Sequence, residues 1–184
     1  MLFDSISCDY FNFQTTPDGK FINITGPDVQ APKMRCNQGV TTFMTDYGAN
    51  RYYIDLEMHE SERLDLFRTW MDTFDEHVKK HVQRNSLEIF GHVKTLDEIG
   101  AMFKKSTTGD AFKLKLDEGT IAKNKDGEHS AVLNKGSLAG NACVVVARPK
   151  LIYFINNMFG VSWYAAQIAF APAKVKPQKY MFLD

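Results

Sequence analysis

The sequence predicts a mainly β fold with a helical insert, an α+β fold, as a single domain over residues 1–184. Three observations lead to this prediction. Apolar and polar residues alternate up to residue 58 and again beyond residue 110, as they do in half-buried strands. From about residue 60 to 108 the apolar residues instead recur with the period of an α-helix. The chain is 44% hydrophobic and 24% charged, which suits one folded domain with a sizeable core.

The N-terminal third predicts a hairpin followed by further strands. Two alternating segments, Phe11–Gln14 and Lys20–Ile24, flank a Pro-Asp-Gly turn at residues 17–19, where proline presets φ and glycine accepts a positive φ. A weaker strand segment, Lys33–Met44, is interrupted by a glycine. The next strand, Arg51–Met58, should bury its even-numbered residues and point its odd-numbered residues the other way.

The helical insert begins after residue 60. An apolar stripe at spacings of 3, 4, 3 and 4 predicts a helix over residues 61–84, and its members are Leu64, Phe67, Met71, Phe74 and Val78. Ser61 is a suitable N-cap for this helix. A second helix should start at Thr95–Glu98, which has the sequence of a capping box, and end at residues 106–109.

The last third returns to strands. Phe112–Leu116 should place three apolar side chains on one face and two lysines on the other. An Asp-Gly turn predicts a hairpin at Asn124–Gly127. Cys143–Ala147 resembles a buried strand that ends at the Arg-Pro-Lys sequence of residues 148–150. Leu151–Ile155 and Ser162–Ala171 should pair around a loop at residues 156–160.

This order of elements favours one architecture over its main alternative. A small closed barrel with a helix between two strands fits it, and an OB-type five-stranded barrel with helices inserted between strands is the prediction. A β-sandwich with a helical insert is the alternative. We expect the tail from about residue 172 to 184 to be mobile, since it is rich in Pro, Lys and Gln.

Composition excludes several classes of protein. The 22 basic and 22 acidic side chains cancel, which excludes reliance on bulk positive charge. The basic residues are nevertheless in excess over residues 110–184, which contain 10 basic and 6 acidic side chains. No apolar run approaches the ~18 residues of a membrane span, and a secretory signal is not expected. The 3 cysteines, far apart in sequence, are expected to be free thiols in a reducing compartment.

No set of residues predicts catalysis or a metal site. His77 and His81 lie four residues apart on the predicted helix, but neither an HExxH motif nor paired CxxC motifs supply further ligands. Cys143 lies in a run that should be core, where thiols are usually inert. We therefore predict no catalytic residues, no metal and no cofactor. An enzyme with a concealed site around the histidines and cysteines is the weakest alternative.

Basic residues interleaved with aromatic residues on the predicted strands are the most distinctive feature. Single-stranded nucleic acid is bound by cations that follow the phosphates and by rings that stack on bases. The candidates for phosphate contacts are Lys33, Arg35, Arg51, Lys113, Lys115, Arg148 and Lys150. The candidates for base stacking are Tyr53, Tyr153 and Trp163. The alternative for each is ordinary packing, with aromatic rings in the core and lysines in solvent.

Four segments carry a resemblance to a known family: Gln30–Val40, Tyr52–Leu56, Phe112–Leu116 and Phe159–Ile168. In this order, with a long acidic helix after the second, they resemble the single-stranded DNA-binding proteins of large eukaryotic DNA viruses. Those are relatives of the phage-type proteins that carry an acidic C-terminal tail. The resemblance covers about residues 20–184 and implies an OB fold, no enzymatic activity and a partner-binding tail. The last five residues of this chain contain one acid and no acidic run.

The expected function is non-catalytic, sequence-independent single-stranded DNA binding in viral DNA replication, recombination or repair. We expect single-stranded DNA as the partner and no membrane, with viral replication proteins and a second copy of the chain as further candidate partners. The expected location is a reducing compartment of an infected host cell, either the nucleus or a cytoplasmic replication site. The alternative function is a non-catalytic protein-interaction or virion structural module, which the 8 Met and 14 Phe residues would suit.

Overall fold

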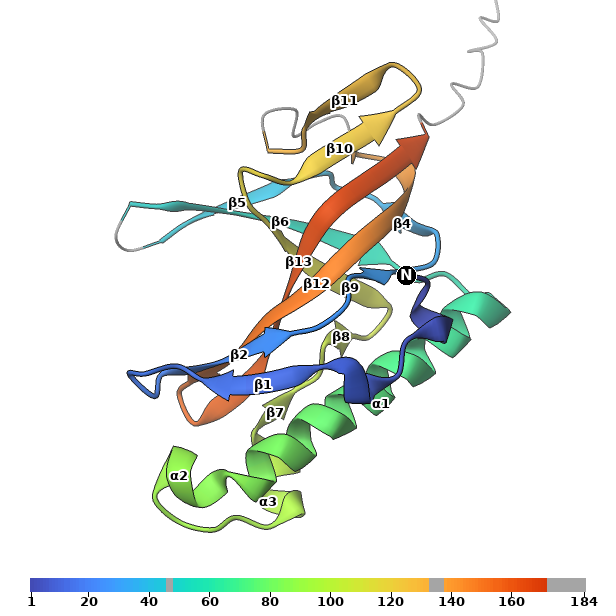
Figure 1. Cartoon of the computed structure of the whole chain (residues 1–184). Coiled ribbons are helices and arrows are strands. Elements are labelled where there is room, and N and C mark those ends of the chain that lie inside the picture. Colours follow the sequence, from blue (N-terminus) through green and yellow to red (C-terminus); the bar gives the residue numbers. More distant parts are fainter. Residues whose placement is uncertain (46–47, 133–137, 172–184) are drawn as a thin grey trace, which may run out of the picture.

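The computed structural model describes residues 1–45, 48–132 and 138–171 (Figure 1). Two short 3-10 turns, Phe3–Ser5 and Cys8–Tyr10, precede the first strand. The strands before the helices are β1 (Asn12–Thr15), β2 (Phe21–Thr25), β3 (Val29–Gln30), β4 (Met34–Cys36), β5 (Thr41–Met44) and β6 (Asn50–Glu57). The helices are α1 (Glu62–Arg84), α2 (Ser86–Phe90) and α3 (Leu96–Met102). The later strands are β7 (Phe103–Lys104), β8 (Thr107–Thr108), β9 (Ala111–Leu116), β10 (Ile121–Asn124), β11 (Gly127–Ser130), β12 (Asn141–Ile155) and β13 (Met158–Ala171).

The helix N-termini are the local features that the sequence predicts best. The Ser61 hydroxyl accepts a hydrogen bond from the backbone N–H of Leu64, which caps α1 as predicted. Thr95 and Glu98 form the predicted capping box at the start of α3. Helix α3, the second helix predicted from the sequence, ends at Met102. This is earlier than predicted, because residues 103–104 pair with β13 as strand β7.

The mainly β fold with a helical insert is confirmed, but the sheet is larger than five strands. Within the described residues it contains 13 strands, because short strands extend its edges. Five of them are joined in a circuit: β12 pairs with β4, β4 with β6, β6 with β9, β9 with β13, and β13 with β12. The β9–β13 pairing is parallel and the other four are antiparallel. Strands β10 and β11 form the hairpin predicted at the Asp-Gly turn, with Asn124 opposite Gly127.

Strand β12 is continuous where the sequence predicts a break. It runs from Asn141 to Ile155 through Pro149, and its register against β13 shifts between Val146 and Ala147 and again between Pro149 and Leu151. A β-bulge adds an unpaired residue, so a proline beside one is accommodated within a long strand. The predicted loop at residues 156–160 is likewise only the turn Asn156-Asn157, both with positive φ, because asparagine tolerates this conformation in tight hairpins.

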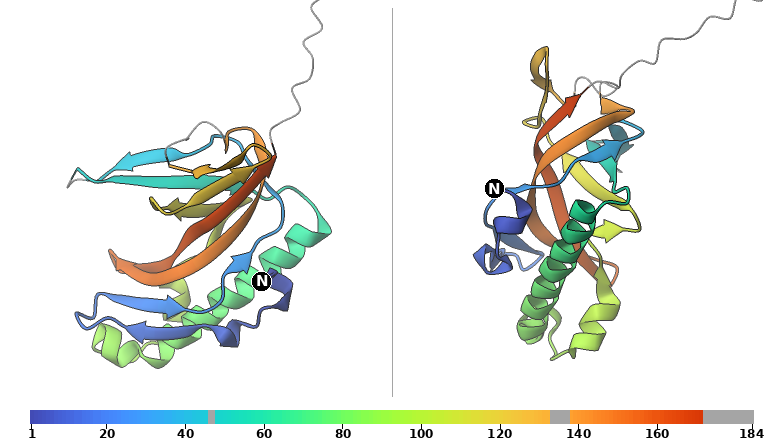
Figure 2. Two further views of the ribbon diagram at one scale, coloured as in Figure 1. Left: turned by 45° about the horizontal axis from the view of Figure 1, so that its top comes forward. Right: turned by 90° about the vertical axis from the view of Figure 1, so that its right-hand side faces the viewer.

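The core lies between the sheet and α1. The stripe of α1 packs Phe67 and Phe74 against rings of the sheet, with Phe67 to Phe112 at 5.7 Å and Phe74 to Trp163 at 5.1 Å between centroids. In Figure 1 this helix lies on the lower side of the strands, whereas the β10–β11 hairpin lies at the upper end, and the first view in Figure 2 shows the same separation. The residues that alternate with this core layer therefore face away from α1.

Some predictions lie outside what the structure describes or tests. The expected mobile tail, about residues 172–184, falls outside the described residues beyond Ala171. The assignment of the chain to one domain stays a prediction. In the described part of the chain, no helix has both the length and the apolar character of a membrane span.

Candidate nucleic-acid interface

A row of paired residues crosses four strands on the face that points away from α1. Tyr53 of β6 is opposite Lys115 of β9, and Lys115 is opposite Tyr164 of β13. Tyr164 is in turn opposite Arg148 of β12. Residues opposite each other in a ladder point to the same face, so these four side chains alternate aromatic and basic across the sheet. At a strand spacing of about 4.8 Å the row is roughly 15 Å wide.

Further cations surround this row. Arg51 lies two residues before Tyr53 and Lys113 two residues before Lys115, which places both on the row's face. Tyr153 is opposite Gly160, where a Cβ would lie 2.8 Å from the tyrosine hydroxyl oxygen, so glycine allows the ring to lie across β13. We name this surface the basic-aromatic face and define it by Arg51, Tyr53, Lys113, Lys115, Arg148, Lys150, Tyr153 and Tyr164.

Lysine side chains on this face lie against tyrosine rings. The Nζ of Lys113 is 5.4 Å from the centroid of the Tyr53 ring. The Nζ of Lys115 is 5.9 Å from the Tyr153 centroid and 5.7 Å from the Tyr164 centroid. These distances are typical of cation–π contacts. The face therefore presents charge and ring surface at the same points, which is the combination that phosphates and unpaired bases require.

Lys115 is the central cation of the face. Its ammonium group donates a hydrogen bond to the Ser162 hydroxyl at 2.8 Å, and among the described residues no carboxylate lies within ion-pair distance of it. Burial, and then the positive charge of Arg51, lower the pKa of Lys115 below its ordinary value. A cation held by a hydroxyl and partly stripped of water gains more from an anionic ligand than a fully solvated lysine does.

A bulge directs Lys150 onto the face. Pro149 is opposite Trp163 and Leu151 is opposite Ser162, so Lys150 is the extra residue of β12 between them. Bulges commonly redirect a side chain in this way. The Nζ of Lys150 lies 4.2 Å from the centroid of the Tyr164 ring. Lys150, Arg148 and Tyr164 are among the residues that line an open hollow of about 400 Å³.

Trp163 is the predicted stacking residue that the structure corrects. Its side chain is 2% exposed and packs against Phe74 and Phe112 in the core, so no base can reach it. Its neighbour Tyr164 faces outward instead. The sequence contains the signal for this assignment, because apolar residues at 159, 161, 163 and 165 alternate with Gly160, Ser162 and Tyr164.

The indole of Trp163 belongs to a buried polar chain that fixes α1 to the sheet. Its Nε1 donates to the Ser106 hydroxyl at 3.0 Å, and this hydroxyl donates to the Asp75 carboxylate at 2.6 Å. The backbone N–H of Ser106 donates to the other carboxylate oxygen at 2.9 Å. Burial nevertheless raises the pKa of Asp75 to about 6, because it disfavours the charged form more than these hydrogen bonds favour it.

The raised pKa of Asp75 predicts that this residue's contribution to stability becomes more favourable as the pH falls from 7 to 4. The folded state binds the Asp75 proton more tightly than the unfolded state does, so the cost of burying the charge is present above pH 6 and disappears toward pH 4. We expect the free energy of unfolding of the wild type, relative to that of Asp75→Asn, to rise by about 2 kcal/mol over this range. Urea unfolding of both proteins at several pH values measures it.

Asp65 provides the control for this pH dependence. It lies on the same helix, is exposed, and pairs with Arg68 at 2.6 Å. The Asp65→Asn variant should keep the wild-type pH profile. Parallel profiles for wild type and Asp75→Asn would show that burial does not raise the pKa of Asp75.

Lys33 and Arg35 lie outside the row of Tyr53, Lys115, Tyr164 and Arg148, although Arg35 is on the same side of the sheet as Tyr53. Both are exposed, but Arg35 is opposite Glu57, four residues along β6 from Tyr53. This separation corresponds to roughly 13 Å along the strand. Glu57 also accepts a hydrogen bond from Asn37, so an acidic side chain adjoins Arg35. The basic-aromatic face thus contains seven of the predicted residues, Arg51, Tyr53, Lys113, Lys115, Arg148, Lys150 and Tyr153. The roles of Lys33 and Arg35 in DNA binding stay predictions.

The two histidines considered as metal ligands pack against an aromatic ring. The Phe13 ring of β1 stacks on His81 at 4.5 Å and lies 5.5 Å from His77. Burial, followed by the positive charges nearby, lowers the pKa of His81. Among the described residues, no three His, Cys, Asp or Glu side chains are placed to share a metal ion. A packing role accounts for the positions of both histidines.

Two solved structures share this fold. No family model matches the sequence, and no curated protein matches it. The single-stranded DNA-binding protein from bacteriophage Enc34, as a C-terminal truncation, is 11% identical with a TM-score of 0.52, over 91% of this chain and 98% of that one. The single-stranded DNA-binding protein gp2.5 encoded by bacteriophage T7 is 12% identical with a TM-score of 0.50, over 84% of this chain and 97% of that one. At these identities the similarity establishes the fold.

Proposed function

We propose that this protein binds single-stranded DNA without sequence preference and without catalysis, in viral DNA replication, recombination or repair. The observation that carries the proposal is the cross-strand row of Tyr53, Lys115, Tyr164 and Arg148. Its cations can contact successive phosphates while its rings stack on bases, and this mode of binding reads no base edges. The fold shared with two phage proteins named for single-stranded DNA binding supports the same function.

We propose further that the circuit of β4, β6, β9, β13 and β12 is the five-stranded OB-type barrel predicted from the sequence. The parallel β9–β13 pairing supports this proposal, because it joins the two ends of an otherwise antiparallel set of strands. OB folds commonly bind oligonucleotides across the outer face of the barrel. The basic-aromatic face occupies four of these five strands, β6, β9, β12 and β13.

The finer predictions about origin and setting belong to the same proposal. We propose a viral protein related to those of large eukaryotic DNA viruses, acting in a reducing compartment of an infected cell. Replication proteins and a second copy of the chain are its proposed protein partners. The resemblance in four sequence segments supports the viral origin, and the free thiols of Cys8, Cys36 and Cys143 are consistent with the compartment.

A salt titration tests the electrostatic part of the proposal. If the five cations of the basic-aromatic face each neutralise one phosphate, log K for oligo-dT should fall with log salt at a slope of about −3.5. Fluorescence anisotropy of labelled oligo-dT is a suitable readout, because Trp163 is buried and its emission does not report base stacking directly. The same titration with duplex DNA of equal length is the comparison, and we expect weaker binding.

Two outcomes would contradict this function. A nearly flat slope for oligo-dT would remove the role of the cations. Equal or tighter binding of the duplex would argue against ring stacking, since paired bases offer no free faces. Absence of DNA binding together with tight self-association would favour the protein-interaction module instead.

A further inference from the structure

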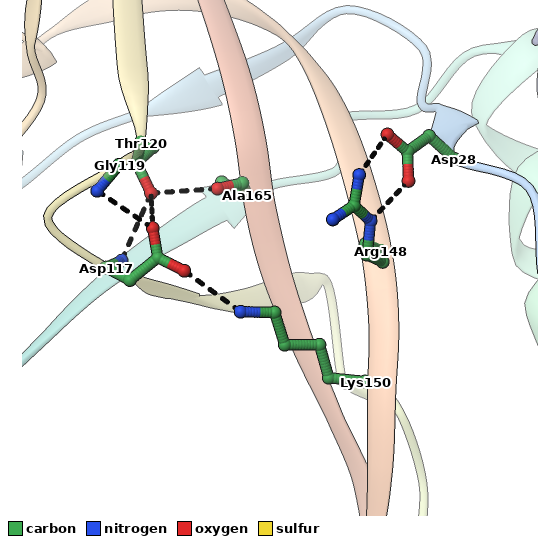
Figure 3. Close-up of polar contacts among 7 residues, drawn as sticks. All are labelled: Asp28, Asp117, Gly119, Thr120, Arg148, Lys150 and Ala165. Atoms are coloured by element: carbon green, nitrogen blue, oxygen red, sulfur yellow. Dashed lines mark hydrogen bonds and ion pairs between the residues drawn. The ribbon is translucent and has the colours of Figure 1, made fainter. Parts of the chain in front are cut away.

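Two carboxylates, Asp28 and Asp117, accept hydrogen bonds from cations of the basic-aromatic face, and a third, Asp55, lies 3.9 Å from Lys113. Asp28, just before β3, accepts two hydrogen bonds from Arg148, at 2.6 Å from Nε and 2.8 Å from Nη2 (Figure 3). Such a two-pronged contact uses the geometry with which a guanidinium also binds phosphate. Asp28 therefore sits where a phosphate oxygen pair would bind Arg148.

The second carboxylate, Asp117, holds Lys150. Its Oδ2 is 3.0 Å from the lysine Nζ, and its Oδ1 accepts from the backbone N–H of Gly119 at 3.1 Å. The turn that carries it is fixed to β13, because the Thr120 hydroxyl donates to the carbonyl of Ala165 at 2.9 Å (Figure 3). Asp117 is thus a rigid anchor that keeps the Lys150 ammonium over the Tyr164 ring.

Both ion pairs border the same hollow of about 400 Å³ and remain accessible to solvent. The exposed fraction of the four side chains lies between 32% for Asp28 and 49% for Arg148. A DNA phosphate can therefore approach either cation. While Asp28 stays in place, however, the phosphate cannot use the Nε–Nη2 edge of Arg148, and Asp117 holds one of the three Lys150 donors.

We propose that Asp28 and Asp117 are positioning residues that compete with DNA phosphates for Arg148 and Lys150. This inference rests on the proposed single-stranded DNA binding. In the free protein the two carboxylates hold both cations at the edge of the hollow, and Lys150 covers the Tyr164 ring. When phosphates take over the cations, Lys150 leaves the ring and a base stacks there. The competition lowers affinity and makes release of the strand easier.

Removing the competing charges should strengthen binding. An exposed ion pair is worth at most about 1 kcal/mol, and this is the free energy that a phosphate must overcome to displace the carboxylate. Asp28→Asn and Asp117→Asn should therefore each bind oligo-dT about two- to five-fold more tightly, and the double variant about ten-fold more tightly. Asparagine at 117 can still accept from Gly119, which preserves the turn. The gain should be largest at low salt and shrink as salt screens the remaining charges, a dependence that a purely structural role would not produce.

Asp72→Asn is the matched control, because it also removes one negative charge and breaks an exposed ion pair, with Lys105 on the α1 side of the molecule. It should leave the affinity unchanged. Equal or weaker binding by both Asp28→Asn and Asp117→Asn, in proteins that melt like the wild type, would overturn the inference while leaving single-stranded DNA binding intact. An equal gain in Asp72→Asn would reduce the effect to net charge and also overturn it. Failure of the wild type itself to bind oligo-dT would overturn both proposals.

Discussion

Reversing the charges of Lys113 and Lys115 together should weaken binding to oligo-dT by roughly 100-fold, the largest effect on binding that we expect. Each lysine lost removes a charge-assisted contact to phosphate, and two such contacts are worth about 3 kcal/mol or more. The salt slope should become shallower by about 1.4, since two fewer phosphates are neutralised. Anisotropy titrations of Lys113→Glu/Lys115→Glu against the wild type at several salt concentrations measure both quantities.

The position of Lys115 explains why this pair should dominate. It is opposite Tyr53 on one side and Tyr164 on the other, so a strand that stacks on both rings must pass over its ammonium group. Lys113 lies on the same strand, 3.9 Å from Asp55, and is more exposed. The inward residues of β9, Phe112, Leu114 and Leu116, are buried and unchanged in the variant, so the fold should survive.

A second pair of cations provides the control. Lys80 and Arg84 are exposed on α1, which packs against the opposite face of the sheet. The Lys80→Glu/Arg84→Glu variant changes net charge by the same amount and should keep affinity close to that of the wild type. If it weakens binding as much as the Lys113/Lys115 variant, the basic-aromatic face is not the binding surface. Because Lys115 is half-buried, the neutral Lys115→Gln variant should also be measured, and it should lose about ten-fold.

Local sequence patterns predict much of this fold because they depend on neighbouring residues. The stripe and Ser61 cap of α1, the capping box at Thr95 and the alternation in β9 all follow from the 3.6- and 2-residue periods. These same periods place Arg51, Tyr53, Lys113 and Lys115 on outward faces. Seven of the ten predicted binding residues consequently belong to the basic-aromatic face.

The remaining features depend on partners distant in sequence. Pro149 suggests a strand end, but the bulge that tolerates it exists only because β13 pairs alongside. Arg35 has an outward position like that of Arg51, yet the pairing of β4 places it beside Glu57. Asp28 and Asp117 have no sequence signal as partners of Arg148 and Lys150, since 120 residues separate the first pair. Their contacts emerge only when the strands close into one sheet.

Truncation of the buried Trp163 gives the largest effect on stability that we expect, whereas truncation of its outward-facing neighbour Tyr164 should have a small one. Trp163→Ala should lower the free energy of unfolding by about 3–5 kcal/mol and the melting temperature by roughly 10 °C. It removes an indole that packs against Trp70, Phe74 and Phe112, and it deprives Ser106 of a donor. Thermal and urea unfolding measure this loss. Tyr164→Ala should cost far less stability, because its ring lies on the surface of the sheet.

For DNA binding we expect the reverse: a change at Tyr164 should lower the affinity for oligo-dT more than a change at Trp163. Tyr164→Ala should weaken oligo-dT binding by about five-fold or more, since stacking on one ring contributes about 1–3 kcal/mol per base. Trp163→Phe keeps an apolar ring in the core, so the folded protein should bind within about two-fold of the wild type. Both affinities must be measured well below the melting temperature of each variant. Loss of binding in Trp163→Phe with unchanged binding in Tyr164→Ala would mean that β13 presents its other face to the strand, and that the row from Tyr53 to Arg148 is not where bases stack.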